Sequence, residues 1–386
     1  MLNKTQKGVY IVSETGCLNP DSGANKHIKA GLIQLKRYFP IELILFCRDY
    51  QTNNAKSKIG IQKNIKQKRS LYFNIRSGLK WLHLLLKNHW HFFSYLRIIK
   101  KHSPEFIYER ACYLNYNGVL IARILGIAHI YEINGILFKD HERYFPPACN
   151  SIAYWLEKKV YEATTFGFYV GGINEFFKIP ANKFLVIQNG IDQEFTTIFK
   201  SKCDKVGDKI NITFIGHAMT HHRLDVLTAA LKLLSNPSAF RLHLIGSNLE
   251  SLKDKIPDTV ETIFYGSLNH SQISELLKGF NVGIITFALP YFSHVKAFMY
   301  GAAKLTMIVP DSKNFKDIFS DEEVIFIKNA DPKDMAEKLN HLAMDTSVLE
   351  QYGENIYNKV CNQFTWEKIY EDVANKIINI LENHPR

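Results

Sequence analysis

Short apolar runs rich in β-branched residues alternate with amphipathic segments along this chain, and that alternation limits the possible folds more than any other feature. Near the N-terminus it predicts a strand over Gly8–Ser13, a helix over Ala24–Tyr38 and a second strand over Ile41–Cys47. Strand, helix and strand in this order form a βαβ unit, which requires a parallel sheet with a right-handed crossover. The chain is therefore expected to be an α/β protein.

The alternation occurs in two series. The first continues with predicted strands over Phe106–Glu109, His129–Ile133, Gly167–Val170 and Leu185–Gln188, and predicted helices over Asn115–Leu125 and Ser151–Ala163. A Lys- and Asp-rich stretch up to Lys209 is interpreted as a linker. The second series has predicted strands over Ile210–Ile215, Arg241–Ile245, Thr262–Tyr265, Val282–Phe287 and Leu305–Val309, and predicted helices over Leu224–Leu234, Ser271–Gly279, Val295–Ala303, Met335–Met344 and Val348–Cys361, with a last helix to Leu381.

A length of 386 residues suits two domains of this kind. We expect two doubly wound Rossmann-like domains over residues 1–195 and 196–365, followed by a C-terminal helix over 366–386. Ligands of such domains bind at the carboxyl ends of the strands.

The net charge of +11 comes from one part of the chain. Twelve Lys and Arg residues and no Asp or Glu lie between Tyr50 and Pro104, so the remainder is close to neutral. Hydrophobic residues make up 46% of the chain and charged residues 22%, which excludes general disorder. No uninterrupted apolar run approaches the ~18 residues of a membrane span, and the N-terminus lacks the pattern of a signal peptide.

The six cysteines form no C-x-x-C pair, which favours free thiols in a reducing compartment over disulfides or a metal site. The expected location is therefore the cytoplasm, with any membrane contact being peripheral at the inner face of the plasma membrane.

Within the basic segment, Gly78–His102 combines an apolar helical face with aromatic and basic residues. This pattern is typical of helices that lie on an anionic membrane surface. The face is expected to include Lys80, Trp81, Trp90, Arg97, Lys100 and Lys101. The alternative is a core helix beside a solvated Lys-rich loop. Nucleic acid is not expected as a partner because no recognition motif accompanies the charge.

Three glycines directly follow strands of the second series: Gly216, Gly246 and Gly266. A residue without a side chain lets a nucleotide approach the backbone, and exposed amides can hold its phosphates. Each glycine taken alone is more often a turn residue. Three at equivalent positions favour a nucleotide site.

Six motifs in order resemble family 4 glycosyltransferases, which have the GT-B fold and transfer a sugar from a nucleotide-sugar donor. They are SGANKH (Ser22–His27), PEFIYER (Pro104–Arg110), HIYEING (His129–Gly135), LVIQNGID (Leu185–Asp192), FIGHAMTHHRLDVL (Phe214–Leu227) and SHVKAFMYGAAKLTMIVPD (Ser293–Asp311). The resemblance implies two domains facing a cleft, a last helix crossing back to the first domain, retention of the anomeric configuration, and no metal or cofactor. It also implies a lipid-linked or saccharide acceptor in bacterial cell-envelope synthesis.

The resemblance also assigns donor contacts. Arg223 stands at the position of a family Lys-Gly pair and, with Lys296, would neutralise the diphosphate. The other implied donor contacts are Gly23, Gly216, His222, Gly246, Gly266, Ser267, Tyr291 and Met299. Tyr291 and Met299 replace two family glutamates, and a thioether is a poor acceptor for ribose hydroxyls. A GT-B protein that has lost its activity and serves as a binding or partner subunit is therefore the alternative function.

On the acceptor side, the resemblance assigns Glu132 and Asn134 to the neighbourhood of the reacting carbon. Glu132 would orient or deprotonate the acceptor hydroxyl, or it is a strand-end carboxylate that caps the next loop. Glu109 and Arg110 are interpreted as an ion pair that holds two elements together, or as acceptor contacts. A metal site at His217, His221 and His222 is not expected, because Asp225 is the sole nearby carboxylate in sequence.

Overall fold

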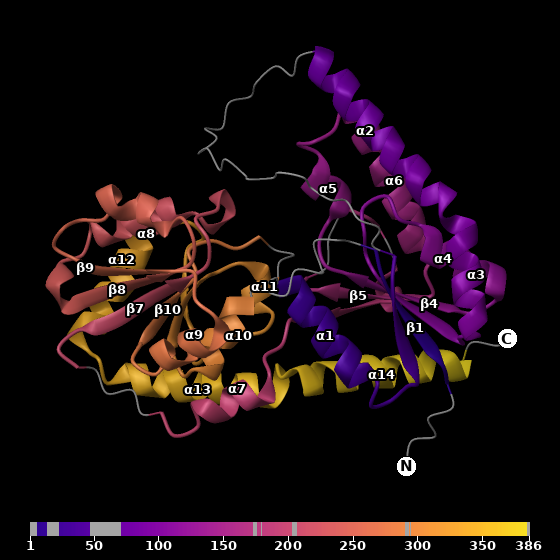
Figure 1. Ribbon diagram of the computed structural model, residues 1–386. Helices are drawn as coiled ribbons and strands as arrows, with labels where there is room; N and C mark the ends of the chain where they lie inside the picture. Colours follow the sequence, from indigo (N-terminus) through magenta and orange to yellow (C-terminus); the bar gives the residue numbers. More distant parts are fainter. Residues whose placement is uncertain are drawn as a thin grey trace. The chain divides into compact units, whose positions relative to one another are not determined.

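The structure of the protein is a computed structural model that describes residues 6–13, 23–46, 71–172, 176–178, 180–202, 207–289, 293 and 295–383 (Figure 1). The chain forms two compact units. Unit 1 comprises the residues up to Ile187 together with those from Tyr370 onward, and unit 2 comprises Gln188–Ile369. The last helix therefore belongs mainly with the first unit.

Unit 1 contains a parallel sheet of six strands in the order β2-β1-β3-β4-β5-β6. The strands are β1 (Gly8–Val12), β2 (Ile41–Leu45), β3 (Phe106–Arg110), β4 (Ala128–Ile133), β5 (Phe166–Val170) and β6 (Phe184–Ile187). The helices are α1 (Gly23–Leu35), α2 (Leu71–Trp90), α3 (Phe92–His102), α4 (Asn117–Leu125), α5 (Leu137–His141), α6 (Pro147–Ala163) and α14 (Trp366–Asn383), with a 3-10 turn at Ala181–Lys183.

Helices cover both faces of this sheet. Val9 and Ile11 point to the side of α3 and α4, where Ile99 and Ile121 complete a buried cluster. Tyr10 points the other way, because successive side chains of a strand alternate between faces. On that opposite side, α1 and α14 are in close contact, since a Cβ added to Gly31 would lie 2.3 Å from the hydroxyl of Tyr370.

Unit 2 contains a second parallel sheet, in the order β9-β8-β7-β10-β11-β12. Its strands are β7 (Ile210–Ile215), β8 (Phe240–Ile245), β9 (Glu261–Gly266), β10 (Val282–Ile284), β11 (Thr306–Pro310) and β12 (Ile325–Ile327). Its helices are α7 (Gln193–Ile198), α8 (Leu224–Leu231), α9 (His270–Leu277), α10 (Val295–Ala302), α11 (Lys313–Lys316), α12 (Pro332–Met344) and α13 (Val348–Gln363), with 3-10 turns at Thr220–His222, Pro237–Ala239 and Leu249–Lys255.

The order of the second sheet is that of the dinucleotide-binding Rossmann fold, in which the chain reverses direction across the sheet after its third strand. The reversal places β10 beside β7, so the switch point of unit 2 lies between these strands. Figure 1 shows α8 and α12 on one side of the sheet and α9, α10 and α13 on the other. Buried clusters on both faces agree with this arrangement.

The structure confirms the α/β class, the two doubly wound sheets and all the predicted strands, with small shifts at their ends. It corrects the predicted linker before Lys209, because α7 lies there and buries Phe195 in the core of unit 2. A helix of six residues is too short to show a period in the sequence. The strand β12 was also missed, since three residues carry little pattern.

Several helices begin or end at residues other than those predicted, and two of these differences have a clear structural cause. The single basic helix predicted over Gly78–His102 is two helices, α2 and α3, which meet at His91. Helix α9 begins one residue earlier than expected because Asn269 caps it, with Gln272 completing a reciprocal capping box. No helix in the described part of the chain is long and apolar enough to cross a membrane.

The contact between α1 and α14 predicts a contrast between two glycines of α1. Gly31→Ala should lower the free energy of unfolding by about 1–3 kcal/mol, because the new methyl group overpacks against Tyr370. Gly23→Ala should leave stability unchanged or raise it by about 0.5–1 kcal/mol, because nothing lies within 4 Å of its Cβ position. Urea unfolding of both variants measures the difference, and equal stabilities would contradict the packing described here.

Candidate functional site

The switch point of unit 2 is surrounded by glycines with positive φ. Gly216 directly follows β7 with φ +150°, and Gly246 directly follows β8 with φ +140°. A Cβ on Gly246 would lie 1.9 Å from the carbonyl oxygen of Gly216, so the two loops approach more closely than any side chain would permit. Gly216 and Gly246 directly follow their strands as predicted, whereas Gly266 is the last residue of β9. The contact of these glycines with a nucleotide stays a prediction.

Lys296, in the first turn of α10, places its ammonium group at this point. A Cβ on Gly216 would lie 3.2 Å from the Nζ of Lys296, and the ammonium lies 4.3 Å from the centre of the Phe214 ring. Burial lowers the pKa of Lys296 from 10.5 to about 7. Among the residues that the structure describes, none forms an ion pair or hydrogen bond with this ammonium. The partly buried lysine thus has a desolvated ammonium group and no compensating negative charge among the described residues.

His222 also lies beside Gly216, with its Cε1 3.1 Å from the position of a Cβ. Its Nδ1 lies 2.7 Å from the carbonyl oxygen of His217, and its own carbonyl oxygen accepts a hydrogen bond from the hydroxyl of Thr286. His217 is tied in turn to Ser247, at 2.7 Å. These bonds fix the loop after β7 to the ends of β8 and β10. Thr286 lies within an apolar run and gave no signal in the sequence.

Arg223 directly follows His222 in the sequence, but its side chain is bonded to Asp225. It has a left-handed backbone (φ 46°), and its guanidinium donates to both carboxylate oxygens of Asp225, with Nε 3.0 Å from Oδ1 and Nη2 2.9 Å from Oδ2. The hydrogen bond from Arg223 lowers the pKa of the Asp225 carboxyl. Both side chains are exposed, so the pair is held weakly. A role for Arg223 at a diphosphate would require it to leave this partner.

The remaining donor predictions divide into three groups. Met299 is partly buried and packs against the core of unit 2. Gly266 (φ 66°) accepts a hydrogen bond from the amide of Gly246, and Ser267 beside it is exposed. Gly23 is exposed at the start of α1, in unit 1, and Tyr291 lies outside the described residues.

Glu132, at the end of β4 in unit 1, is fully buried and surrounded by hydrogen-bond donors. Its carboxylate accepts from the hydroxyl of Tyr108 (2.6 Å), from Nη1 of Arg110 (2.5 Å) and from the hydroxyl of Tyr370 (3.2 Å). The Nε2 of His27 lies 3.3 Å away. Burial by itself would raise the pKa of Glu132, but the charges of His27 and Arg110 outweigh it and hold this pKa well below its usual range.

A carboxylate in these surroundings is a poor general base, because it holds a proton weakly and has no exposed surface. Its contacts favour the structural alternative: Glu132 joins β3, β4, α1 and α14 within unit 1. Asn134 is part of the same group, since its side-chain amide donates to Oε1 of Glu132 at 2.8 Å. A catalytic part for either residue stays a prediction.

Glu109 and Arg110 do not pair with each other, because neighbouring residues of a strand point to opposite faces. Arg110 pairs with Glu132, while Glu109 lies 2.8 Å from Nε2 of His129 and accepts from Asn115 at 2.7 Å. Both residues are buried, so they connect elements as expected but through different partners.

On the basic helices, Trp81 is not part of an exposed face. It is only 4% exposed, and its Nε1 donates to the hydroxyl of Tyr113 at 3.1 Å. The sequence could not predict that Trp81 is buried and Trp90 exposed. It indicates two apolar sides on one helix but not which of them packs against the domain. Trp90, Lys80, Arg97, Lys100 and Lys101 are exposed as predicted.

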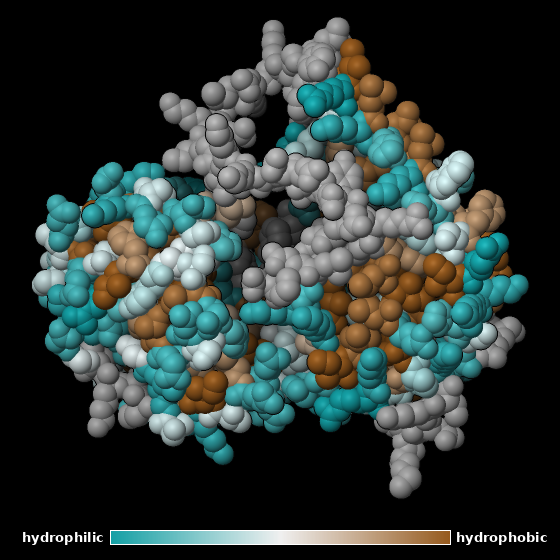
Figure 2. Space-filling view, in the orientation of Figure 1, coloured by the Kyte–Doolittle hydropathy of each residue, from teal (hydrophilic) through white to brown (hydrophobic). Residues whose placement is uncertain are grey.

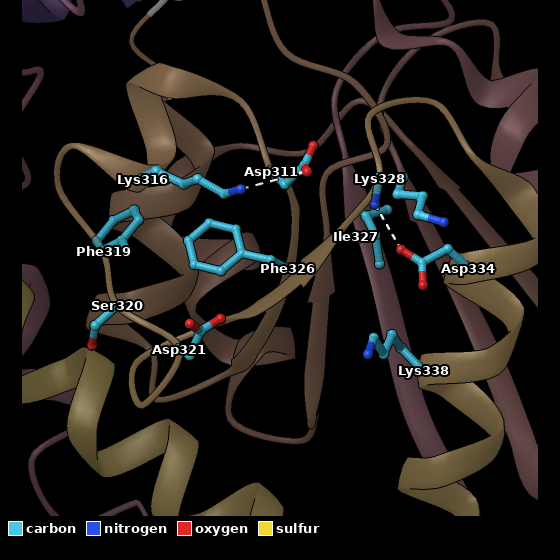
Figure 3. Close-up of a pocket in the computed structure, with 10 residues that line it drawn as sticks. All are labelled: Asp311, Lys316, Phe319, Ser320, Asp321, Phe326, Ile327, Lys328, Asp334 and Lys338. Atoms are coloured by element: carbon cyan, nitrogen blue, oxygen red, sulfur yellow. Dashed lines mark hydrogen bonds and ion pairs between the residues drawn. The ribbon is translucent and has the colours of Figure 1, made fainter.

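A cavity of about 390 Å³ lies elsewhere in unit 2, at the edge strand β12 (Figure 3). It is lined by Asp311, Lys316, Phe319, Ser320, Asp321, Phe326, Ile327, Lys328, Asp334 and Lys338. Figure 3 shows Lys316 beside Asp311 and the backbone of Lys328 bonded to Asp334, so several of its polar groups already have partners. None of the predicted donor residues lines it, and the switch point, where Lys296 has no counter-charge among the described residues, is the stronger candidate.

No group of three metal-ligating side chains occurs within the described ranges of the chain. His217 bonds to Ser247, and His222 lies within hydrogen-bond distance of the carbonyl oxygen of His217, whereas the His221 side chain lies outside the described part of the structure.

The surroundings of Glu132 predict a large effect on stability. Glu132→Gln should cost about 3–5 kcal/mol of unfolding free energy, because it leaves the buried charge of Arg110 without its counter-charge. Glu162→Gln, which removes an exposed partner of Lys159, should cost less than about 1 kcal/mol. Denaturant unfolding at neutral pH measures both. A stable but inactive Glu132→Gln enzyme would instead support the general-base role.

Comparisons with known proteins support the same fold. Residues 225–375 match the family model described as Glycosyl transferase-like, which covers most of unit 2. No curated protein matches the chain significantly.

Three solved structures are similar over nearly the whole chain. Sucrose-phosphate synthase from Thermosynechococcus elongatus has a TM-score of 0.70 at 12% identity, with 98% of this chain and 100% of that chain covered. The lipopolysaccharide outer core galactosyltransferase WaaB has a TM-score of 0.67 at 15% identity, with 96% and 99% covered. HepE from Anabaena in complex with UDP has a TM-score of 0.63 at 12% identity, with 97% and 100% covered. The protein therefore has the GT-B fold.

Proposed function

We propose that the protein is a glycosyltransferase that binds the diphosphate of a nucleotide-sugar donor at the switch point of unit 2. One observation carries the proposal: Lys296 has a desolvated ammonium group without a counter-charge among the described residues, beside Gly216. A charge in such a place is costly unless it is paired. A bound phosphate would supply the missing charge and restore the lysine to its protonated form.

The neighbouring backbone suits the same ligand. Lys296 lies in the first turn of α10, where the helix dipole and unpaired amides favour an anion. Gly216 leaves the end of β7 free of a side chain, and the rule for open α/β sheets locates ligands outside the carboxyl ends of strands at the switch point. Lysine, glycine and helix terminus thus lie close together within one unit.

The finer properties of the reaction follow from the family resemblance. We propose a family 4-type enzyme that transfers a hexose with retention of configuration and uses protein cations in place of a metal. HepE has been solved with UDP and with UDP-glucose, which makes uridine nucleotides the first donors to test. WaaB is named as a galactosyltransferase of the lipopolysaccharide outer core. That name supports the proposal of a saccharide or lipid-linked acceptor of the cell envelope, at the inner face of the membrane.

The packing of Met299 favours a second candidate function. Because this side chain joins the core where the family has a ribose-binding glutamate, the donor has one carboxylate fewer to hold it. A GT-B protein that binds a partner or an acceptor without transferring sugar would tolerate that loss. The two candidates differ in whether a nucleotide sugar is consumed.

A panel of nucleotide sugars tests the proposal through Lys296. The native protein should bind and turn over at least one donor, and Lys296→Met should weaken donor binding at least about tenfold, which is about 1.4 kcal/mol. Titration calorimetry measures binding, and release of the free nucleotide measures turnover. Lys278→Met, on the exposed surface of α9, is the control and should bind as the native protein does. Absence of binding and turnover across the panel would reject the enzyme and favour the partner subunit.

The same lysine predicts a change of stability that separates ligand binding from folding. Lys296→Met should raise the melting temperature of the free protein, because it removes an uncompensated charge from a desolvated place. Lys304→Met should lower it, since the Lys304 ammonium is also buried but bonds to Glu354 and to the carbonyl oxygens of Lys200 and Lys202.

The lowered pKa of Lys296 predicts proton uptake on binding. At pH 8 the lysine of the free protein is mostly neutral, since its pKa is about 7, and a bound phosphate would return it to the charged form. Calorimetry of nucleoside diphosphate binding in buffers of different ionisation enthalpy should therefore show uptake of most of a proton, and Lys296→Met should show none. Binding that is independent of the buffer would contradict the assignment.

The lowered pKa of Lys296 also makes the unfolding free energy depend on pH. The unfolded chain holds this proton up to about pH 10.5, whereas the folded chain releases it near pH 7. Between these values the unfolded state binds more protons, so the contribution of Lys296 to unfolding free energy rises with pH. The rise should be absent from Lys296→Met.

A further inference from the structure

Helices α2 and α3 carry an apolar row on their outward side. Along the row, exposed apolar side chains recur every three or four residues, which is the spacing of one helix face. Its members are Ile75, Leu79, Leu82, Leu86, Trp90 and Phe93. Leu79 is 63% exposed and Trp90 83% exposed, values that are unusual for large apolar side chains. Figure 2 shows hydrophobic side chains gathered along the outer edge of α2.

The opposite side of α2 already packs against unit 1. Ser77 is buried, Trp81 is bonded to Tyr113, and Asn88 donates to the carbonyl oxygen of Leu114 at 2.9 Å. Each inward residue stands two positions from an outward one, and residues two apart lie on nearly opposite sides of a helix. The outward row is therefore not needed for packing α2 onto its own domain.

Basic side chains accompany the row, and acidic ones do not. From Leu71 to His102 the sequence has six Lys and Arg residues and no Asp or Glu. Arg76 and Lys80 lie four residues apart on one flank of the row, and Arg97, Lys100 and Lys101 lie beyond Phe93 on α3. Within the part of the chain that the structure describes, none of these five has an ion-pair partner.

We propose that the row formed by Ile75, Leu79, Leu82, Leu86, Trp90 and Phe93 docks on an anionic lipid bilayer, with Trp90 and Phe93 entering the interfacial layer. An outward apolar row with basic residues beside it is the pattern of helices that lie in a membrane interface. Anionic headgroups would supply the counter-charges that these basic residues lack.

A second copy of the chain is the main competing occupant. Pairing two such faces would bring together rows that carry positive charge alone, and like charges across an interface are costly. The positive charge beside the row therefore favours a negatively charged surface over a second copy of the chain. The proposal does not depend on the donor site in unit 2, so either can fail without the other.

The test is flotation of the full chain with vesicles of phosphatidylcholine, with and without phosphatidylglycerol, at low ionic strength. The native protein should bind the anionic vesicles and bind the neutral ones much more weakly. Leu79→Ser combined with Leu86→Ser should reduce binding at least about tenfold, because it removes apolar area from the interface. Ile33→Ser, at an exposed apolar position of α1, should change nothing.

A charge-matched pair separates location from net charge. Arg76→Glu with Lys80→Glu should reduce binding to anionic vesicles at least about tenfold. Lys158→Glu with Lys159→Glu changes the net charge equally on α6 and should retain most of the binding. An equal loss in both pairs would overturn the assignment to α2, since bulk charge would then explain the binding.

Trp90 supplies a direct readout. Its emission should shift to shorter wavelength on vesicle binding, and Trp90→Phe should remove the shift while leaving the melting temperature unchanged, because the side chain is exposed. Absence of binding to anionic vesicles at low salt would overturn the proposal. So would a dimer in sedimentation that Leu79→Ser with Leu86→Ser dissociates, because the row would then be an interface between copies.

Discussion

Parallel strands bring all their carboxyl ends to one edge of a sheet, and the candidate site depends on this constraint. In unit 2 the strand order reverses between β7 and β10, which leaves the loops after these strands to diverge at the sheet edge. Gly216 follows β7, Gly246 follows β8, and the segment after β10 leads to α10 with Lys296. Residues far apart in the sequence therefore meet because of the strand order.

Buried charges in this protein differ in whether they are compensated. Glu132 has donors from three neighbouring elements and a pKa well below its usual range, which is the condition of a charge that belongs to the fold. Lys304 is likewise buried and bonded. Lys296 has an aromatic ring and a glycine beside it, and its pKa is lowered to about 7. Lys296 therefore differs from Glu132 and Lys304 in having no charged partner among the described residues.

The same reasoning applies to apolar surface. Trp81 and Trp90 are nine residues apart on one amphipathic helix, and both were predicted from the sequence to lie on its exposed face. In the structure, Trp81 is buried with its indole bonded, whereas Trp90 is exposed. A helix with two apolar sides can bury only one of them against its own domain. The outward side is the one that remains for another partner.

The sequence by itself determined the α/β class, the two series of strands and the glycines at the ends of β7, β8 and β9, because hydrophobic periodicity and glycine at strand ends are local properties. It also named Lys296 and Glu132 through motifs. Tertiary structure alone decided that Glu132 is enclosed by His27, Arg110 and Tyr370, that Arg223 pairs with Asp225, and that Lys296 has no such partner among the described residues. Partners of a side chain come from distant segments, so whether a charge is paired or a face is covered emerges only when the chain has folded.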